Sequence, residues 1–158
     1  MDIVKHPITG QEPKLSTSSP YSALVDFYRS FNNQNYELMK SNWSLSDEIS
    51  MSNPLGGIKR GWNEIEEVYK KIFNGPAKVY VEFYEYSIYT SETMFLAAGR
   101  ERGTLEINNE IINLAIRTSR AYCLQENQWK QIHHHGSMDN PELLAIYQKA
   151  LRNNKLEI

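Results

Sequence analysis

The sequence predicts an α+β fold in which a strongly curved antiparallel sheet wraps around helices and forms a cone with an open mouth. Apolar residues recur at helical spacing early in the chain and again at its end. Four consecutive extended segments lie between these helical regions. Segregated helices and consecutive strands are typical of α+β domains whose helices cover one sheet face. At 158 residues, the chain is expected to form one main domain.

The first half is expected to hold a polar arm, two helices, a strand and a third helix. Ser19 and Pro20 are suited to the N-cap and first position of the opening helix. Leu45 begins a period-two alternation that indicates a half-buried strand. The expected segments are an arm at 1–19, helices at 20–32 and 36–43, a strand at 45–53 and a helix at 62–73.

The second half is expected to hold the long strands and a last helix. β-branched and aromatic residues dominate the first of these strands, and a short polar connection before Gln128 predicts a closing hairpin. Asn140 and Pro141 then provide a cap and a first turn. The expected strands span 78–89, 93–107, 110–124 and 128–136; the domain boundaries are 20–138 for the main domain and 139–158 for the C-terminal helix.

Composition and charge exclude several classes of protein. The formal net charge of −2 gives no general attraction to nucleic acid or to an anionic membrane. No run of apolar residues reaches membrane-helix length, and the N-terminal residues lack the apolar core of a signal peptide. Cys123 is the single cysteine, so an intramolecular disulfide is excluded. We expect a cytoplasmic protein with no nucleic-acid or membrane partner.

Three segments together point to a known family. They are FYRSFNNQNYELM in the opening helices, MSNPLGGIKRGWNEIEEVYKKIF from strand to helix, and IRTSRAYCLQENQWKQIHHHGS in the closing hairpin. In this order they resemble the nuclear-transport-factor-2-like superfamily, also called SnoaL-like or ketosteroid-isomerase-like, over roughly residues 20–138. The chain is also similar to the association (hub) domain of calcium/calmodulin-dependent kinases. The resemblance implies a cystatin-like cone around a pocket and a homodimer formed through the sheet.

The same resemblance leaves the function open. Some members of the superfamily are isomerases, cyclases or dehydratases, and many are non-catalytic binding or assembly domains, so the fold does not decide between them. We expect a small, largely apolar ligand with an acidic group in a conical pocket. The alternatives are an enzyme of the ketosteroid-isomerase-like type and a dimerisation module. No cofactor is expected.

Two arginines are the leading candidates for ligand contact. Arg100 ends the apolar row of Met94, Leu96 and Ala98, and Arg120 ends a similar row in the next strand. Period-two alternation predicts that each arginine shares a face with its apolar row. A buried guanidinium needs a carboxylate, a carbonyl or a ligand anion. The hub resemblance implies that Arg120 matches a pocket arginine and Arg100 lies near a second, while Gly136 replaces a third.

The arginines have an alternative role. They can pair with a dimer mate or with a carboxylate of the same chain, and the candidates for the latter are Glu101, Glu106 and Asp47.

The three consecutive histidines cannot all point the same way on a strand. His133 and His135 share one face, and His134 takes the other. A metal site would need further ligands, and the sequence offers no His/Cys cluster that would supply them, so no metal is expected. Either His134 or the other pair should face the pocket, where a neutral imidazole can act as a base or form a hydrogen bond.

These arguments define the candidate site. Asn53 lies where catalytic relatives often carry a carboxylate, and an amide is a poor base. Asn53 thus argues against proton abstraction, and for the enzyme alternative the candidate bases are His134 and Asp26. The expected ligand-binding residues are Trp43, Asn53, Phe73, Tyr84, Arg100, Arg120, His133, His134 and His135.

Overall fold

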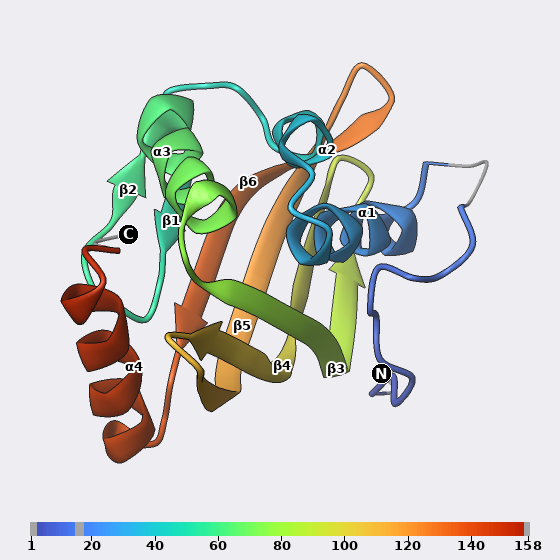
Figure 1. The fold of residues 1–158 in the computed structure, drawn as a ribbon. Coiled ribbons are helices and arrows are strands. Elements are labelled where there is room, and N and C mark those ends of the chain that lie inside the picture. Colours follow the sequence, from blue (N-terminus) through green and yellow to red (C-terminus); the bar gives the residue numbers. More distant parts are fainter. Residues whose placement is uncertain (1–2, 15–17, 157–158) are drawn as a thin grey trace.

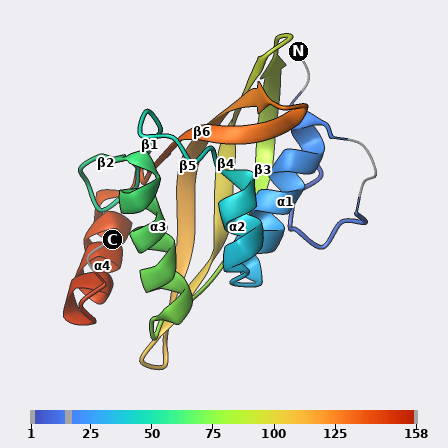
Figure 2. The ribbon, with the colours of Figure 1, turned by 90° about the horizontal axis from the view of Figure 1, so that it is seen from above.

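The structure is a computed structural model that describes residues 3–14 and 18–156. Figure 1 shows a curved sheet with helices packed against one of its faces, and Figure 2 shows the same arrangement from above. The α+β cone predicted from the sequence is confirmed. The elements in order are α1 (Pro20–Asn32), α2 (Tyr36–Asn42), β1 (Ser50–Ser52), β2 (Lys59–Arg60), α3 (Gly61–Asn74), β3 (Lys78–Thr90), β4 (Met94–Ile107), β5 (Glu110–Gln125), β6 (Gln128–Ser137) and α4 (Pro141–Asn153).

The sheet has six strands in the order β2-β1-β6-β5-β4-β3. All neighbouring pairs are antiparallel except β1 and β6, which run parallel, so the sheet is mixed. The long hairpins β3–β4 and β4–β5 form its body. β3, β4 and β5 are long and are joined by short connections. The limits predicted for them from the sequence therefore agree closely with the structure.

The region before α3 differs from the prediction. The strand expected at 45–53 is wrong in extent, because only Ser50–Ser52 pairs with β6. The Ser46 hydroxyl accepts a hydrogen bond from the Glu48 amide at 2.9 Å, which closes a local turn in place of an extended segment. The two-residue strand β2 was not predicted.

The N-terminal arm lies along β3. The Ile8 amide donates to the Phe83 carbonyl at 2.8 Å, and the Phe83 amide donates back to the Ile8 carbonyl at 2.9 Å. The Ile8 side chain is fully buried, so this part of the arm belongs to the core. Parts of the predicted arm and of the predicted C-terminal segment, at 1–2, 15–17 and 157–158, lie outside the described residues.

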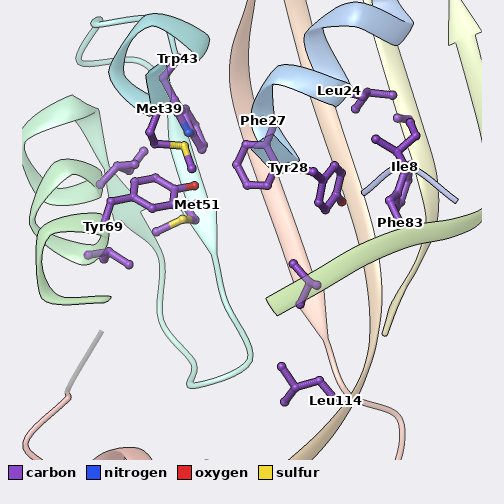
Figure 3. Packing of buried hydrophobic residues seen from close by; sticks show 14 of the residues in the cluster. Ile8, Leu24, Phe27, Tyr28, Met39, Trp43, Met51, Tyr69, Phe83 and Leu114 are labelled. Atoms are coloured by element: carbon purple, nitrogen blue, oxygen red, sulfur yellow. The ribbon is translucent and has the colours of Figure 1, made fainter. Parts of the chain in front are cut away.

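The core fills the space between the helices and the inner sheet face. Figure 3 shows α1 contributing Leu24, Phe27 and Tyr28 to this layer. Tyr28 stacks on Phe83 of β3 with ring centroids 5.6 Å apart. α1 is fixed at its start by the predicted Ser19 cap, which accepts from the Ser22 amide. No described helix has the length and apolarity needed to cross a membrane.

Candidate functional site

A cavity of about 90 Å³ lies between the helices and the inner sheet face. A single water needs roughly 10–15 Å³ by a comparable measure, so the space admits several waters or one small molecule. Phe27, Met51, Tyr69 and Leu114, which Figure 3 shows on different elements, all line this cavity. The lining is mostly apolar; it comprises Phe27, Phe31, Met51, Asn53, Pro54, Val68, Tyr69, Ile72, Val79, Val81, Glu101, Leu114, Ile116, Arg120, His134 and Tyr147.

The polar end of the cavity is built on a buried ion pair. The Arg120 Nη2 lies 2.9 Å from Glu101 Oε1, and only 3% and 5% of the two side chains is exposed. The Tyr28 hydroxyl donates to the same Glu101 oxygen at 2.6 Å. Arg120 also donates to Gln131 Oε1 at 3.2 Å, and its guanidinium lies 3.5 Å from the centroid of the Phe27 ring. Buried charges persist only when paired and hydrogen-bonded in this way.

Strand register explains why these groups meet. Arg120 of β5 pairs with Ala97 of β4 on one side and with His134 of β6 on the other. His134 in turn pairs with Met51 of β1. Residues opposite one another in a sheet share a face, so the inner face carries Arg120 and His134 side by side.

At this end of the interior, His134 and Gln131 each keep a buried nitrogen with no hydrogen-bond partner in the part of the chain that the structure describes, and of the two only His134 lines the cavity. Its side chain is more than nine-tenths buried, it lines the cavity, and Nδ1 has no hydrogen-bond partner among the described residues. Burial, and then the charge of Arg120, hold the pKa of His134 well below its usual value of 6.5. The imidazole is therefore neutral at pH 7. A buried polar atom without a partner is costly and is a site where a ligand can gain affinity.

Two tyrosines add hydroxyl groups to the lining. Burial raises the pKa of Tyr69 to about 12, and burial also raises the pKa of Tyr147. Both side chains stay protonated at neutral pH and can donate hydrogen bonds. The site thus combines an apolar wall, a neutral histidine, hydroxyl groups and an ion pair whose charges cancel.

The structure brings three of the predicted site residues to the cavity: Arg120, His134 and Asn53. The alternative role predicted for Arg120, an ion pair with Glu101, is confirmed. Asn53 lies at the rim just after β1, where its side-chain oxygen accepts from the Leu55 amide at 3.0 Å.

Two predicted residues lie in the core beside the cavity and do not line it. Trp43 is buried, with its ring centroid 6.3 Å from that of Tyr69. Phe73 is half-buried and packs edge-on against Phe31.

The predicted orientations of Arg100 and Tyr84 are wrong. Arg100 lies on the outer sheet face, half exposed, with Nε 3.5 Å from Glu85 Oε2. Tyr84 is its partner across β3 and β4 and faces the same way. The physical reason is that both faces of β4 begin with apolar residues, so an apolar row alone does not identify the inner one. The odd-numbered row of Phe95, Ala97, Glu101 and Leu105 is the buried one.

The remaining candidates also lie away from the cavity. His133 and His135 take the face opposite to His134, and His133 Nδ1 lies 2.8 Å from the Ser50 hydroxyl. Asp26 is partly exposed on α1 and pairs with Arg29 at 2.8 Å. Across residues 3–14 and 18–156, no group of three or more His, Cys, Asp or Glu side chains is placed to hold a metal ion.

Sequence reasoning did not place Glu101 or Tyr147 in the cavity lining, although it named Glu101 as a possible ion-pair partner of an arginine. Alternation alone could not assign Glu101 to the inner face, because both faces of β4 begin with apolar residues. Tyr147 belongs to the apolar stripe of the last helix, and nothing in that stripe indicates which member enters a cavity.

Comparison with known proteins agrees with this architecture. Residues 21–141 match the family model of the SnoaL-like domain. A nuclear transport factor 2-like superfamily protein from Salmonella enterica superposes with a TM-score of 0.66 at 21% identity, covering 73% of this chain and 84% of that one. A ketosteroid isomerase-like protein from Erwinia carotovora atroseptica has a TM-score of 0.64 at 17% identity, over 77% and 94% of the two chains.

A third similar structure comes from Thiobacillus denitrificans and is assigned as a calcium/calmodulin-dependent protein kinase type II association domain. Its TM-score is 0.63 at 20% identity, covering 82% of this chain and all of that one. No curated protein matches the sequence. At these identities the similar structures establish the fold alone.

Proposed function

The chain belongs to the family of SnoaL-like domains, within the nuclear-transport-factor-2-like superfamily, and from this premise we propose that its cavity binds a small, largely apolar molecule ending in a neutral oxygen group. The observation that carries the proposal is the buried, unpartnered Nδ1 of His134 at the edge of an apolar cavity. A neutral imidazole nitrogen either donates or accepts, according to the tautomer. A hydroxyl group suits both tautomers, and a carbonyl suits one.

The charges of the site favour a neutral group over an acidic one. An acidic group was expected from Arg120, but Glu101 already occupies that guanidinium at 2.9 Å. A carboxylate ligand would have to share Arg120 with a buried carboxylate, and like charges at close range repel strongly in a low dielectric. A hydroxyl or carbonyl group is uncharged, so it can bind without sharing Arg120 with Glu101.

Binding is better supported than catalysis. Asp26 lies outside the cavity and is paired with Arg29. His134 has a pKa well below 6.5 because of burial, which makes it a weak base. Glu101 is tied to both Arg120 and Tyr28 through one oxygen. The ketosteroid isomerase-like neighbour shares the fold, but this chain lacks a free carboxylate at its cavity among the residues that the structure describes.

A thermal-shift experiment with matched compounds tests the proposal. We expect cyclopentanol and cyclopentanone to raise the melting temperature, because a ligand that binds only the folded state stabilises it by mass action. Cyclopentanecarboxylate and methylcyclopentane should give smaller shifts. The Leu114→Phe variant, which fills the cavity, should abolish the shift, and Ile111→Phe on the exposed face of the same strand should keep it.

The polar contact has its own control. His134→Leu should reduce the cyclopentanol shift to that of methylcyclopentane, whereas His135→Leu, one residue away on the outer face, should not. If no compound stabilises the protein, or if Leu114→Phe leaves the shifts unchanged, binding in this cavity is refuted.

A second function, self-association through the outer sheet face, is favoured by a specific row of residues. Tyr89 pairs with Leu96, and Leu96 pairs with Ala121, so the three lie side by side across β3, β4 and β5. Tyr89 and Leu96 are 48% and 40% exposed. A row of exposed apolar side chains on an uncovered sheet is typical of a protein–protein contact. We propose a homodimer formed through this row, in line with the association domain that the fold resembles.

A further inference from the structure

Helix α4 lies at the boundary of the segment that matches the SnoaL-like family model. The SnoaL-like match ends at residue 141, and α4 begins at Pro141. Both views of the fold place α4 on the side of the molecule where β1 and β2 lie, apart from the α1 and α2 pair (Figures 1 and 2). Even so, α4 supplies Tyr147 to the cavity lining. This chain therefore closes its cavity with a side chain from outside the segment that defines the family.

The rim of the cavity brings α4 together with the segment that follows β1. Asn53 and Pro54 line the cavity as Tyr147 does. Gln148, the next residue of α4, donates from Nε2 to the Pro54 carbonyl at 3.3 Å. A hydrogen bond of that length is weak, so it holds α4 against Pro54 only loosely.

The attachment of α4 is strongest at its far end. Leu151 and Leu156 are buried, and Gly75 lies against Leu156. Asn154 accepts a hydrogen bond from the Asn108 side chain at 2.8 Å. Towards the start of the helix, Leu143 and Leu144 are only partly buried, and part of the Tyr147 side chain is exposed although burial of its hydroxyl raises its pKa. Segments with little buried apolar surface open at lower free energy than the core.

We propose that α4 is a lid on the cavity and that Tyr147 is the residue that contacts the ligand and limits its size. In the closed state Tyr147 forms the wall next to Asn53 and Pro54. Opening breaks the Gln148–Pro54 bond and moves Tyr147 away from Asn53 and Pro54, while α4 stays tied to β6 through the short link that contains the buried Met138 and to the core through Leu151. The identity of the ligand rests on the proposed function, but the opening motion does not.

Thiol labelling of a cavity cysteine tests the lid without a ligand. Leu114→Cys in a Cys123→Ser chain places one thiol in the cavity wall. We expect the introduced thiol to react slowly with a thiol reagent, at a rate set by the opening of α4. Low urea should not change this rate, because opening of α4 exposes much less surface than global unfolding does. Tyr147→Ala should speed labelling about tenfold, because it removes the wall that α4 contributes. Ile146→Ala, which alters an exposed neighbour on the same helix, should leave the rate unchanged.

A milder variant and a ligand series separate the possible outcomes. Tyr147→Leu keeps the apolar stripe of α4 and replaces Tyr147→Ala if that variant does not fold. Its labelling rate should lie between those of the parent chain and of Tyr147→Ala. In Tyr147→Ala, cyclohexylmethanol should stabilise the protein more than cyclopentanol does, the reverse of the parent chain.

If Tyr147→Ala speeds labelling while no compound binds, the lid is supported and the proposed function is refuted. If compounds bind but neither the labelling rate nor the size preference responds to Tyr147→Ala, the lid is refuted. Labelling that follows global unfolding in every variant refutes it as well.

Discussion

A single guanidinium organises the polar end of the interior. Arg120 is 2% exposed and reaches Glu101, Tyr28 and Gln131, with the Phe27 ring beneath it. The desolvation of such a charge is recovered only through its partners, so the pair need not add net stability. What the pair does provide is a fixed, neutral polar surface beside an apolar cavity.

The ion pair leads to a prediction about stability. Glu101→Gln should lower the free energy of unfolding by about 3–5 kcal/mol, because it leaves the buried charge of Arg120 uncompensated. Glu82→Gln, which breaks the exposed pair with Arg102 on the neighbouring strands, should cost about 0–1 kcal/mol. Urea unfolding measures both. Equal losses for the two variants would contradict the assignment of Glu101 and Arg120 as a buried pair.

His134 leads to a prediction about pH. Because its folded-state pKa lies below the unfolded value of 6.5, the unfolded chain takes up the proton first as pH falls. The contribution of His134 to the free energy of unfolding is fully present above about pH 6.5. It is lost as the pH falls below that value, by up to about 1.4 kcal/mol per pH unit. His134→Gln should flatten this loss of stability between pH 7 and 5. A smaller pH dependence should remain because burial also lowers the pKa of His133.

The control for the pH effect is His135→Gln, because that side chain is exposed. An unchanged slope in His134→Gln would mean that the buried imidazole is not the group that titrates.

At the level of elements, β4 shows how far alternation can be read from sequence. Its limits and its pairing with β5 follow from the pattern, but its inner face does not, because Leu96 and Phe95 are equally plausible core residues. The inner row includes glycines, at Gly99 and Gly103, where an apolar side chain would normally identify the face. The same ambiguity left Glu101 out of the predicted lining and placed Arg100 on the wrong face.

Gly99 has a structural reason to lack a side chain. Between Tyr84 and Ser87 the register of β3 shifts, and Glu85 adopts a φ of 48°. This bulge turns Tyr86 inward, where it is buried against the strand. A Cβ on Gly99 would lie 2.6 Å from the Tyr86 Cβ and 2.9 Å from the Phe83 ring.

We therefore predict that Gly99→Ala costs about 1–3 kcal/mol of stability through overpacking at the bulge. Ala98→Ser, at the adjacent position on the outer face, should change the free energy of unfolding by less than about 0.5 kcal/mol. Chemical denaturation of the two variants gives the comparison. A harmless Gly99→Ala would show that the bulge and Tyr86 are not packed as described.

At the scale of the whole molecule, the sequence predicted the cone and the closing hairpin, because long strands and capped helices carry strong local signals. It did not predict the parallel β1–β6 pair, since three residues give too short a pattern. It placed Arg120 on the inner face through the apolar residues Ile112, Leu114 and Ile116 of β5, a row that reaches Arg120 through Thr118. It could not predict that α4 closes the cavity, because that depends on how a terminal helix packs against distant strands.

The proposed dimer belongs to this scale. Leu96→Lys should convert a dimer to a monomer, because it places a charge in the apolar row that the proposed interface would bury. Ile58→Lys, at an exposed position between β1 and β2, should leave the dimer intact. Light scattering coupled to size exclusion distinguishes the two masses. A monomeric parent chain at high concentration would exclude the interface.

The cavity itself is tested most directly by nuclear Overhauser effects between cyclopentanol and the protein. We predict intermolecular effects from the ring protons of the alcohol to the methyl groups of Leu114 and Ile116, together with a change at the His134 ring. The Leu114→Phe variant should lose them. Effects confined to outer-face residues such as Leu96, or no effects at saturating concentration, would contradict the account of the cavity as a binding site.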